Sequence, residues 1–101
     1  MLPPTSKRLE EPDAVPYFLW DTGQTAGEIR RVLAGQSGSE KDLLIARILR
    51  EANTRDVWLF LGWKDIDEAW TRIETRLGRA RPVWEMLRAR HLELRGRGTS
   101  R

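Results

Sequence analysis

The sequence predicts an all-α protein, a compact single domain of about five short helices preceded by an extended aromatic segment. Most apolar residues beyond position 25 recur at the three- and four-residue spacing of a helix face. Capping signals precede several of these stretches, and glycines or an Asn-Thr pair separate them. A chain of 101 residues supports one core, which buries roughly 60 to 65 per cent of the surface that the unfolded chain exposes.

Both ends of the chain are predicted to be flexible. Residues 1–15 are rich in proline and charge and have no apolar periodicity, so we expect a flexible lead. Residues 96–101, GRGTSR, form a basic tail with no reason to fold. The helical domain should therefore span residues 16–95.

The first two helices follow from their caps and apolar faces. The spacing of Thr25 and Glu28 is that of a capping box, and Gly35 is placed to end the first helix in a left-handed conformation. Ser39 can cap a second helix whose interior reads LLIARIL at 43–49. This stripe is wide and leaves mainly Arg47 and Glu51 for solvent, so we expect the second helix to be central and the most buried.

The stretch DVWLFL at 56–61 is apolar on every side, and periodicity alone does not separate a buried strand from a buried helix. A short helix is favoured because Thr54 can cap it and helices stand on both sides. The next helix is predicted from Lys64 to Leu77, and Gly78 should end it.

A last helix begins at Pro82, which suits a first helical position. Its apolar stripe comprises Val83, Trp84, Leu87, His91 and Leu94.

The triplet Asp21-Thr22-Gly23 has the form of an aspartic protease motif. Such an enzyme needs two carboxylates that share a proton, each on a turn between strands, and a chain of this length supplies them only as a dimer. The residues after Gly23 enter a capped helix instead. We therefore interpret the triplet as a turn, in which the aspartate accepts a backbone amide and the glycine takes positive φ.

Other chemistry is not indicated, so we expect no enzyme, no catalytic residues, no cofactor and no metal site. The chain lacks a phosphate-binding loop, a nucleophile elbow and a zinc-binding helix motif. It has no cysteine and one histidine, His91, which we expect to be partly buried in its helix. No apolar run approaches a membrane span and the N-terminus lacks a secretion signal, so we expect a cytoplasmic protein without membrane contact.

Two sequence features indicate interaction surfaces. Tyr17, Phe18 and Trp20 precede the first helix, and they are either a strap that fills a groove or an exposed anchor that binds a partner. Residues 72–101 carry 9 basic and 3 acidic side chains, whereas residues 1–71 carry 9 and 12. Arg72, Arg76, Arg79 and Arg81 of this basic block could contact phosphates, which gives DNA binding as an alternative function.

The chain also resembles a family of small bacterial all-helical proteins of unknown function, which are often encoded beside abortive-infection nucleotidyltransferase-type toxins. The resemblance spans about Pro16 to Arg88 and is carried by YFLWD at 17–21, IARIL at 45–49, DVW at 56–58, Arg81 and Trp84. It implies a toxin-antitoxin or phage-defence setting, with this chain as the antitoxin or an accessory subunit. It brings no catalytic residues.

The resulting hypothesis is a non-enzymatic protein-interaction module that binds another protein, such as a nucleotidyltransferase-like toxin, through the aromatic segment. The alternative is a small DNA-binding transcriptional regulator that uses the arginine block.

Overall fold

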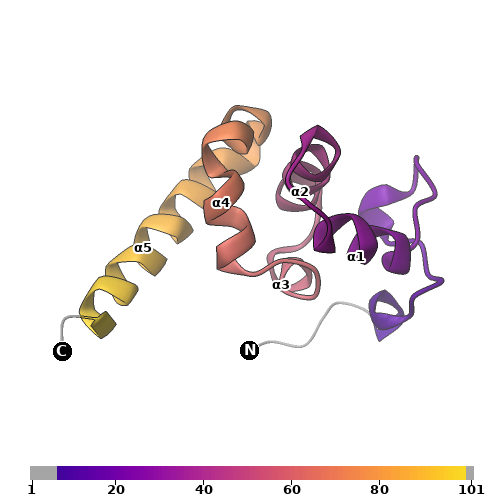
Figure 1. The fold of residues 1–101 in the computed structure, drawn as a ribbon, viewed down its shortest axis with the longest axis horizontal. Helices are drawn as coiled ribbons and strands as arrows, with labels where there is room; N and C mark the ends of the chain where they lie inside the picture. Colours follow the sequence, from indigo (N-terminus) through magenta and orange to yellow (C-terminus); the bar gives the residue numbers. More distant parts are fainter. Residues whose placement is uncertain (1–6, 100–101) are drawn as a thin grey trace.

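The computed structural model describes residues 7–99 as an all-α protein, which confirms the predicted fold class, and none of these residues is in a strand. The α-helices are α1 (Ala26–Ala34), α2 (Ser39–Glu51), α3 (Thr54–Val57), α4 (Trp63–Ile73) and α5 (Arg81–Thr99). Short 3-10 helices are η1 (Lys7–Glu10), η2 (Tyr17–Leu19), η3 (Glu74–Arg76) and η4 (Gly78–Ala80). Figure 1 shows α1, α2 and α3 together on one side, α4 in the middle and the long α5 on the other side.

No helix within residues 7–99 is long and apolar enough to cross a membrane.

Residues 7–15, which belong to the lead predicted for 1–15, pack against the start of α1. Ala14 is buried, and its carbonyl oxygen accepts a hydrogen bond from the Ala26 amide at 2.8 Å. The Pro12 carbonyl oxygen accepts from the Gly27 amide at 2.8 Å, where a Cβ on Gly27 would lie only 3.0 Å from that oxygen. First-turn amides have no partner within their own helix, which is why this segment has a defined place. Residues 1–6 lie outside the described part.

The aromatic segment differs from the prediction, because it is a turn of 3-10 helix and not an extended strap. Pro16 precedes η2 with φ −62° and ψ 146°. The Leu19 amide then donates to the Pro16 carbonyl oxygen at 2.9 Å. In this tight turn Phe18 is buried, whereas Tyr17 and Trp20, three residues apart, are exposed.

Helix α1 begins at the predicted capping box. The Glu28 amide donates to Thr25 Oγ1 at 3.2 Å, and the Thr25 amide donates to Glu28 Oε1 at 3.1 Å. The backbone and side-chain hydrogen bonds from Thr25 hold the pKa of Glu28 below its ordinary value. The predicted left-handed end is wrong, because Gly35 has φ −77° and ψ −177°.

Replacing Thr25 with alanine removes this cap, so we expect a loss of about 1 kcal/mol in the free energy of unfolding. Urea denaturation of the parent and of Thr25→Ala measures it. Thr71→Ala is the matched control, since Thr71 is exposed within α4 and alanine suits a helix interior. Equal stability of Thr25→Ala and the parent would contradict the role of the capping box.

Helix α2 lies at the centre of the core, as predicted. Leu44, Ile45, Ile48 and Leu49 are buried, and α2 contacts α1, α3 and α4 as well as η2 and η4. Each fully buried aliphatic side chain contributes roughly 1.5 to 3 kcal/mol relative to exposure. Leu43 departs from the predicted stripe, since it is 52% exposed.

At the end of α2, one hydrogen bond of the helical pattern is replaced by two bonds to aromatic side chains. In a continuing α-helix the Asn53 amide would donate to the Leu49 carbonyl oxygen. Here Leu49 O accepts from Trp84 Nε1 of α5 at 2.8 Å. The Asn53 amide donates to the hydroxyl oxygen of Tyr17 in η2 at 2.6 Å. Trp84 thus satisfies the carbonyl acceptor of the missing helical bond, and Tyr17 satisfies its amide donor.

The stretch at 56–61 is helical only in its first part. Helix α3 ends at Val57, and its cap is Asn53, whose side-chain oxygen accepts from the Arg55 amide, and not Thr54 as predicted. Helix α4 then begins at Trp63, and Gly78 turns the chain toward α5 with φ 53°.

Helix α5 is longer than predicted, because it continues to Thr99 through the first part of the expected tail at 96–101. Extension of a formed helix gains one hydrogen bond for each residue fixed. Residues 100 and 101 lie outside the described part.

Helix α5 is joined to α4 by stacked aromatic rings and an ion pair. His91 stacks on Trp63 with ring centroids 4.6 Å apart, and Trp84 meets the same ring edge-on at 6.1 Å. Arg88 Nε donates to Asp67 Oδ1 at 2.8 Å. His91 is partly buried, as expected, with Trp63 as its stacking partner.

Candidate functional site

The structure separates the three aromatic residues that were predicted to bind a partner. Phe18 is 3% exposed and belongs to the core, where its ring meets Phe60 edge-on with centroids 5.7 Å apart. Tyr17 is half exposed. Trp20 is 79% exposed, the largest value among the exposed large apolar side chains of the described residues. Trp20 therefore remains as the candidate anchor, and Phe18 does not.

Tyr17 attaches the turn to the region of α3. Its hydroxyl donates to Asp56 Oδ2 at 2.7 Å and accepts from the Asn53 amide at 2.6 Å. The Asp56 side chain is fully buried, and a buried carboxylate is costly unless hydrogen bonds satisfy it. Tyr17 thus has a structural role even though half of its surface faces solvent.

The Asp-Thr-Gly triplet closes the turn that carries Trp20. The Leu19 carbonyl oxygen accepts from the Thr22 amide at 3.1 Å and from the Gly23 amide at 3.0 Å. Thr22 Oγ1 also donates to Leu19 O at 3.1 Å. Gly23 has φ 70°, the conformation predicted for it, which a residue with a side chain rarely adopts. The triplet lies between η2 and α1 and not between strands.

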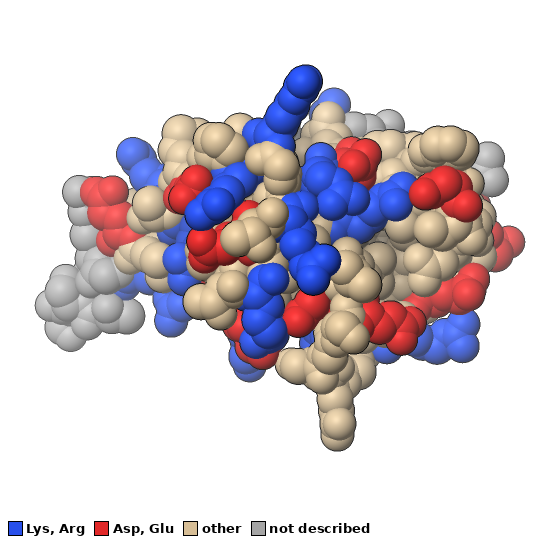
Figure 2. Space-filling model, turned by 90° about the horizontal axis from the view of Figure 1, so that it is seen from above, with Lys and Arg blue, Asp and Glu red and all other residues tan. Residues whose placement is uncertain are grey.

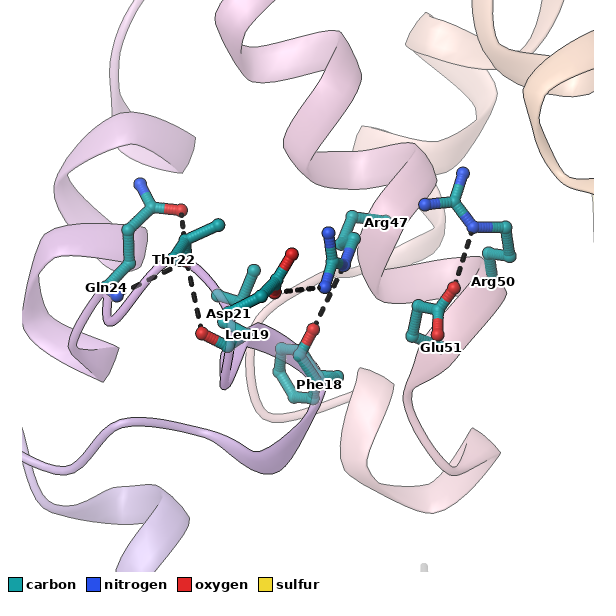
Figure 3. A network of polar contacts seen from close by, with 8 residues as sticks. All are labelled: Phe18, Leu19, Asp21, Thr22, Gln24, Arg47, Arg50 and Glu51. Atoms are coloured by element: carbon teal, nitrogen blue, oxygen red, sulfur yellow. Dashed lines mark hydrogen bonds and ion pairs between the residues drawn. The ribbon is translucent and has the colours of Figure 1, made fainter.

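Arg47 of α2 reaches over this turn (Figure 3). Its Nε donates to the Phe18 carbonyl oxygen at 3.1 Å, and its Nη2 donates to Asp21 Oδ1 at 2.5 Å. The Arg47 hydrogen bond lowers the pKa of Asp21 from its ordinary value, and the backbone amides of Asp21 and Thr22 add to the effect. One guanidinium therefore holds the residues on either side of Leu19 and Trp20.

A hollow of about 220 Å³ opens beside the turn, between η2, α1 and α2. Its lining consists of Leu19, Val32, Leu43 and Leu44 with Thr22, Gln24, Glu40 and Arg47. Leu19 and Thr22 precede and follow the Trp20-Asp21 pair in sequence, so the hollow lies beside the turn that carries Trp20. We call Trp20 and this hollow together the Trp20 face.

The structure brings the four arginines predicted to contact DNA close to the junction of α4 and α5, but two are held by acidic groups. Arg72 donates from Nε to Asp42 Oδ2 and from Nη2 to Glu68 Oε2, both at 2.8 Å. These bonds raise the pKa of Arg72 above its ordinary value. Arg81 donates to Glu74 at 2.9 Å.

The other two arginines of the predicted DNA surface, Arg76 and Arg79, are exposed, and their side chains have no hydrogen bond or ion pair within the described residues. Figure 2 shows basic side chains near the middle of the upper face, with acidic side chains beside them. This mixed charge is weaker for phosphate binding than a continuous basic surface. DNA binding stays a prediction.

No group of three or more acidic or histidine side chains within the described part is placed to hold a metal ion.

Sequence reasoning missed Arg47 and the hollow. The apolar stripe of LLIARIL leaves Arg47 on the face predicted to meet solvent. A long side chain with a charged head can cover the helix surface and reach a neighbouring turn. The position of Arg47 within an apolar run is the sequence signal that indicates such a contact. The hollow depends on how α1 and α2 cross, which no local pattern specifies.

A scan of protein-family models finds no match to this chain, and searches of curated proteins and of solved structures also find none.

Proposed function

We propose that this protein is a non-enzymatic interaction module that binds another protein through the Trp20 face. The observation that carries the proposal is Trp20, a tryptophan that is 79% exposed on a turn whose residues Leu19 and Thr22 line a largely apolar hollow. Exposing so large an apolar side chain has a free-energy cost that burial in a complex would recover. Tryptophan is also enriched among the residues that dominate protein interfaces.

The size of the hollow favours a protein partner over a small ligand. Its volume of about 220 Å³ is below the range of roughly 300 to 1,000 Å³ typical of small-molecule pockets. A single apolar side chain of a partner fits such a space. In the complex, that side chain would occupy the hollow while Trp20 packs on the partner's surface.

The resemblance described above supports a toxin-antitoxin or phage-defence setting. In that setting the partner is a nucleotidyltransferase-like toxin, and this chain is its antitoxin or accessory subunit. The product of the adjacent gene is accordingly the partner to test first.

Co-purification with that product tests the proposal, followed by titration of the complex. We expect Trp20→Ala to weaken binding at least about thirtyfold, the effect of losing an interface hot spot of 2 kcal/mol. The matched control is Met86→Ala, because Met86 is 64% exposed on α5, which lies on the opposite side of the molecule from α1 (Figure 1). It should change affinity less than about threefold.

Two results would count against the proposal. One is the absence of any complex at micromolar concentrations. The other is a complex that Trp20→Ala and Met86→Ala weaken equally.

A further inference from the structure

We infer that Arg47 is a positioning residue that clamps the turn from Phe18 to Asp21 and thereby presents Trp20 in one fixed orientation to a partner. The inference deepens the proposed function and rests on it for the use of Trp20 in binding. The fixed orientation itself is a property of the isolated chain. It can therefore be tested without a partner.

The two groups that Arg47 contacts lie on either side of Trp20 in the sequence. Arg47 binds the Phe18 carbonyl oxygen two residues before Trp20 and the Asp21 carboxylate one residue after it. Figure 3 shows the guanidinium in contact with both acceptors. A planar guanidinium with several donors can satisfy both acceptors at once, which a lysine ammonium on a flexible stem does less well.

Several residues attach the turn to the rest of the protein, and Arg47 adds a polar attachment to α2. Thr22 and Gly23 close the turn on the Leu19 carbonyl oxygen, and Tyr17 is bound to Asp56 and Asn53. Phe18 and Leu19 lie in the core cluster that also contains Leu44 and Ile45 of α2, and Arg47 adds the polar side-chain contacts between this segment and α2. The Arg47 side chain is 23% exposed, so much of it is shielded from water and is held against the turn.

The clamp has a binding consequence because mobile side chains lose freedom when a complex forms. Ordering one such side chain costs roughly 0.5 to 1.5 kcal/mol. A turn that Arg47 already holds avoids part of the cost of ordering the segment that carries Trp20. Loss of the clamp should therefore weaken the complex about two- to tenfold, less than loss of Trp20 itself.

The test uses fluorine NMR of the full chain made with 5-fluorotryptophan, which gives one signal for each of its five tryptophans. Trp20→Phe identifies the Trp20 signal. In Arg47→Ala that signal should narrow and move toward the position of free 5-fluorotryptophan, while the other four stay in place. Arg47→Lys should give an intermediate position, since it keeps the charge but not the planar fork.

Arg50→Ala is the matched control on the same helix. Arg50 donates to Glu51 at 2.9 Å and to the Arg76 carbonyl oxygen at 3.1 Å, away from the turn. It should leave all five signals unchanged. Asp21→Ala is a second variant that breaks the clamp from the side of the turn without altering α2, and it should move the Trp20 signal in the same direction as Arg47→Ala.

The pH dependence provides an independent readout. The pKa of Asp21 is lowered in the folded chain, so the ion pair is complete above the ordinary aspartate range and is lost as pH falls through the lowered pKa. The Trp20 signal of the parent should move toward its Arg47→Ala position over that acidic range. The Asp21→Asn variant should not show this movement.

A Trp20 signal that is unchanged in Asp21→Ala would overturn the inference, whatever Arg47→Ala does to the fold. The inference and the proposed function fail separately. If Trp20 becomes mobile in the clamp variants but the chain binds no partner, the clamp stands and its use in binding does not. A complex that needs Trp20 but is indifferent to both clamp variants would remove the clamp's role and retain the proposed function.

Discussion

Replacing Trp84 with alanine is expected to lower the free energy of unfolding by about 3 to 5 kcal/mol, the range for deleting a large buried aromatic side chain. Trp84 is 2% exposed and packs edge-on against Trp58 with ring centroids 5.9 Å apart. Its indole nitrogen also donates to the Leu49 carbonyl oxygen, one of the last carbonyls of α2 that the helix itself cannot satisfy. The substitution creates a cavity and leaves that carbonyl without its donor.

Urea denaturation followed by circular dichroism at a helical wavelength measures this loss. Trp84→Phe separates the two contributions, since it keeps most of the ring volume and removes the donor. It should lose about 1 to 3 kcal/mol. Met86→Ala is the exposed control on the same helix and should change stability by no more than about 0.5 kcal/mol. A loss below about 1 kcal/mol in Trp84→Ala would contradict the packing described for α5.

Replacing Tyr17 with phenylalanine is expected to lower the free energy of unfolding by about 1.5 to 3 kcal/mol. The change removes the hydroxyl that donates to the fully buried Asp56 carboxylate and accepts from the Asn53 amide. Hydrogen bonds to charged groups contribute more than neutral ones, and a buried acceptor that loses its donor retains its desolvation cost. The ring remains, so its edge contact with Phe18 is retained.

Thermal and urea denaturation measure the effect, with Trp20→Phe as control. Trp20 lies in the same turn, but it is exposed, so its replacement should change stability by no more than about 0.5 kcal/mol. If Tyr17→Phe is as stable as Trp20→Phe, then the Tyr17 hydroxyl does not hold the turn.

The parts of the fold that sequence predicts well are those fixed by local chemistry. The capping box at Thr25 and Glu28 is satisfied within four residues, so its pattern suffices. Helix α2 has a wide apolar stripe, and all of it except Leu43 is buried at the centre of the core. The conformation of the DVWLFL stretch is predicted less well, because uniformly apolar residues fit several conformations and tertiary contacts decide where the helix ends.

The parts that sequence misses are those fixed by contacts between distant segments. The lead at 7–15 has no periodicity of its own, and its contacts are with first-turn amides of α1 more than ten residues later. The candidate site has the same limit. Which of Tyr17, Phe18 and Trp20 faces solvent depends on the 3-10 turn of η2 and on Arg47, which is contributed by a helix more than twenty residues later.

The interrupted hydrogen bond at the end of α2 links these segments energetically. The Leu49 carbonyl oxygen holds α5 through Trp84, and the Asn53 amide holds the Trp20 turn through Tyr17. Unwinding of this one helical turn would break both hydrogen bonds, so we expect the attachments through Trp84 and Tyr17 to open together. Binding that stabilises the Trp20 turn should for that reason also slow the detachment of α5.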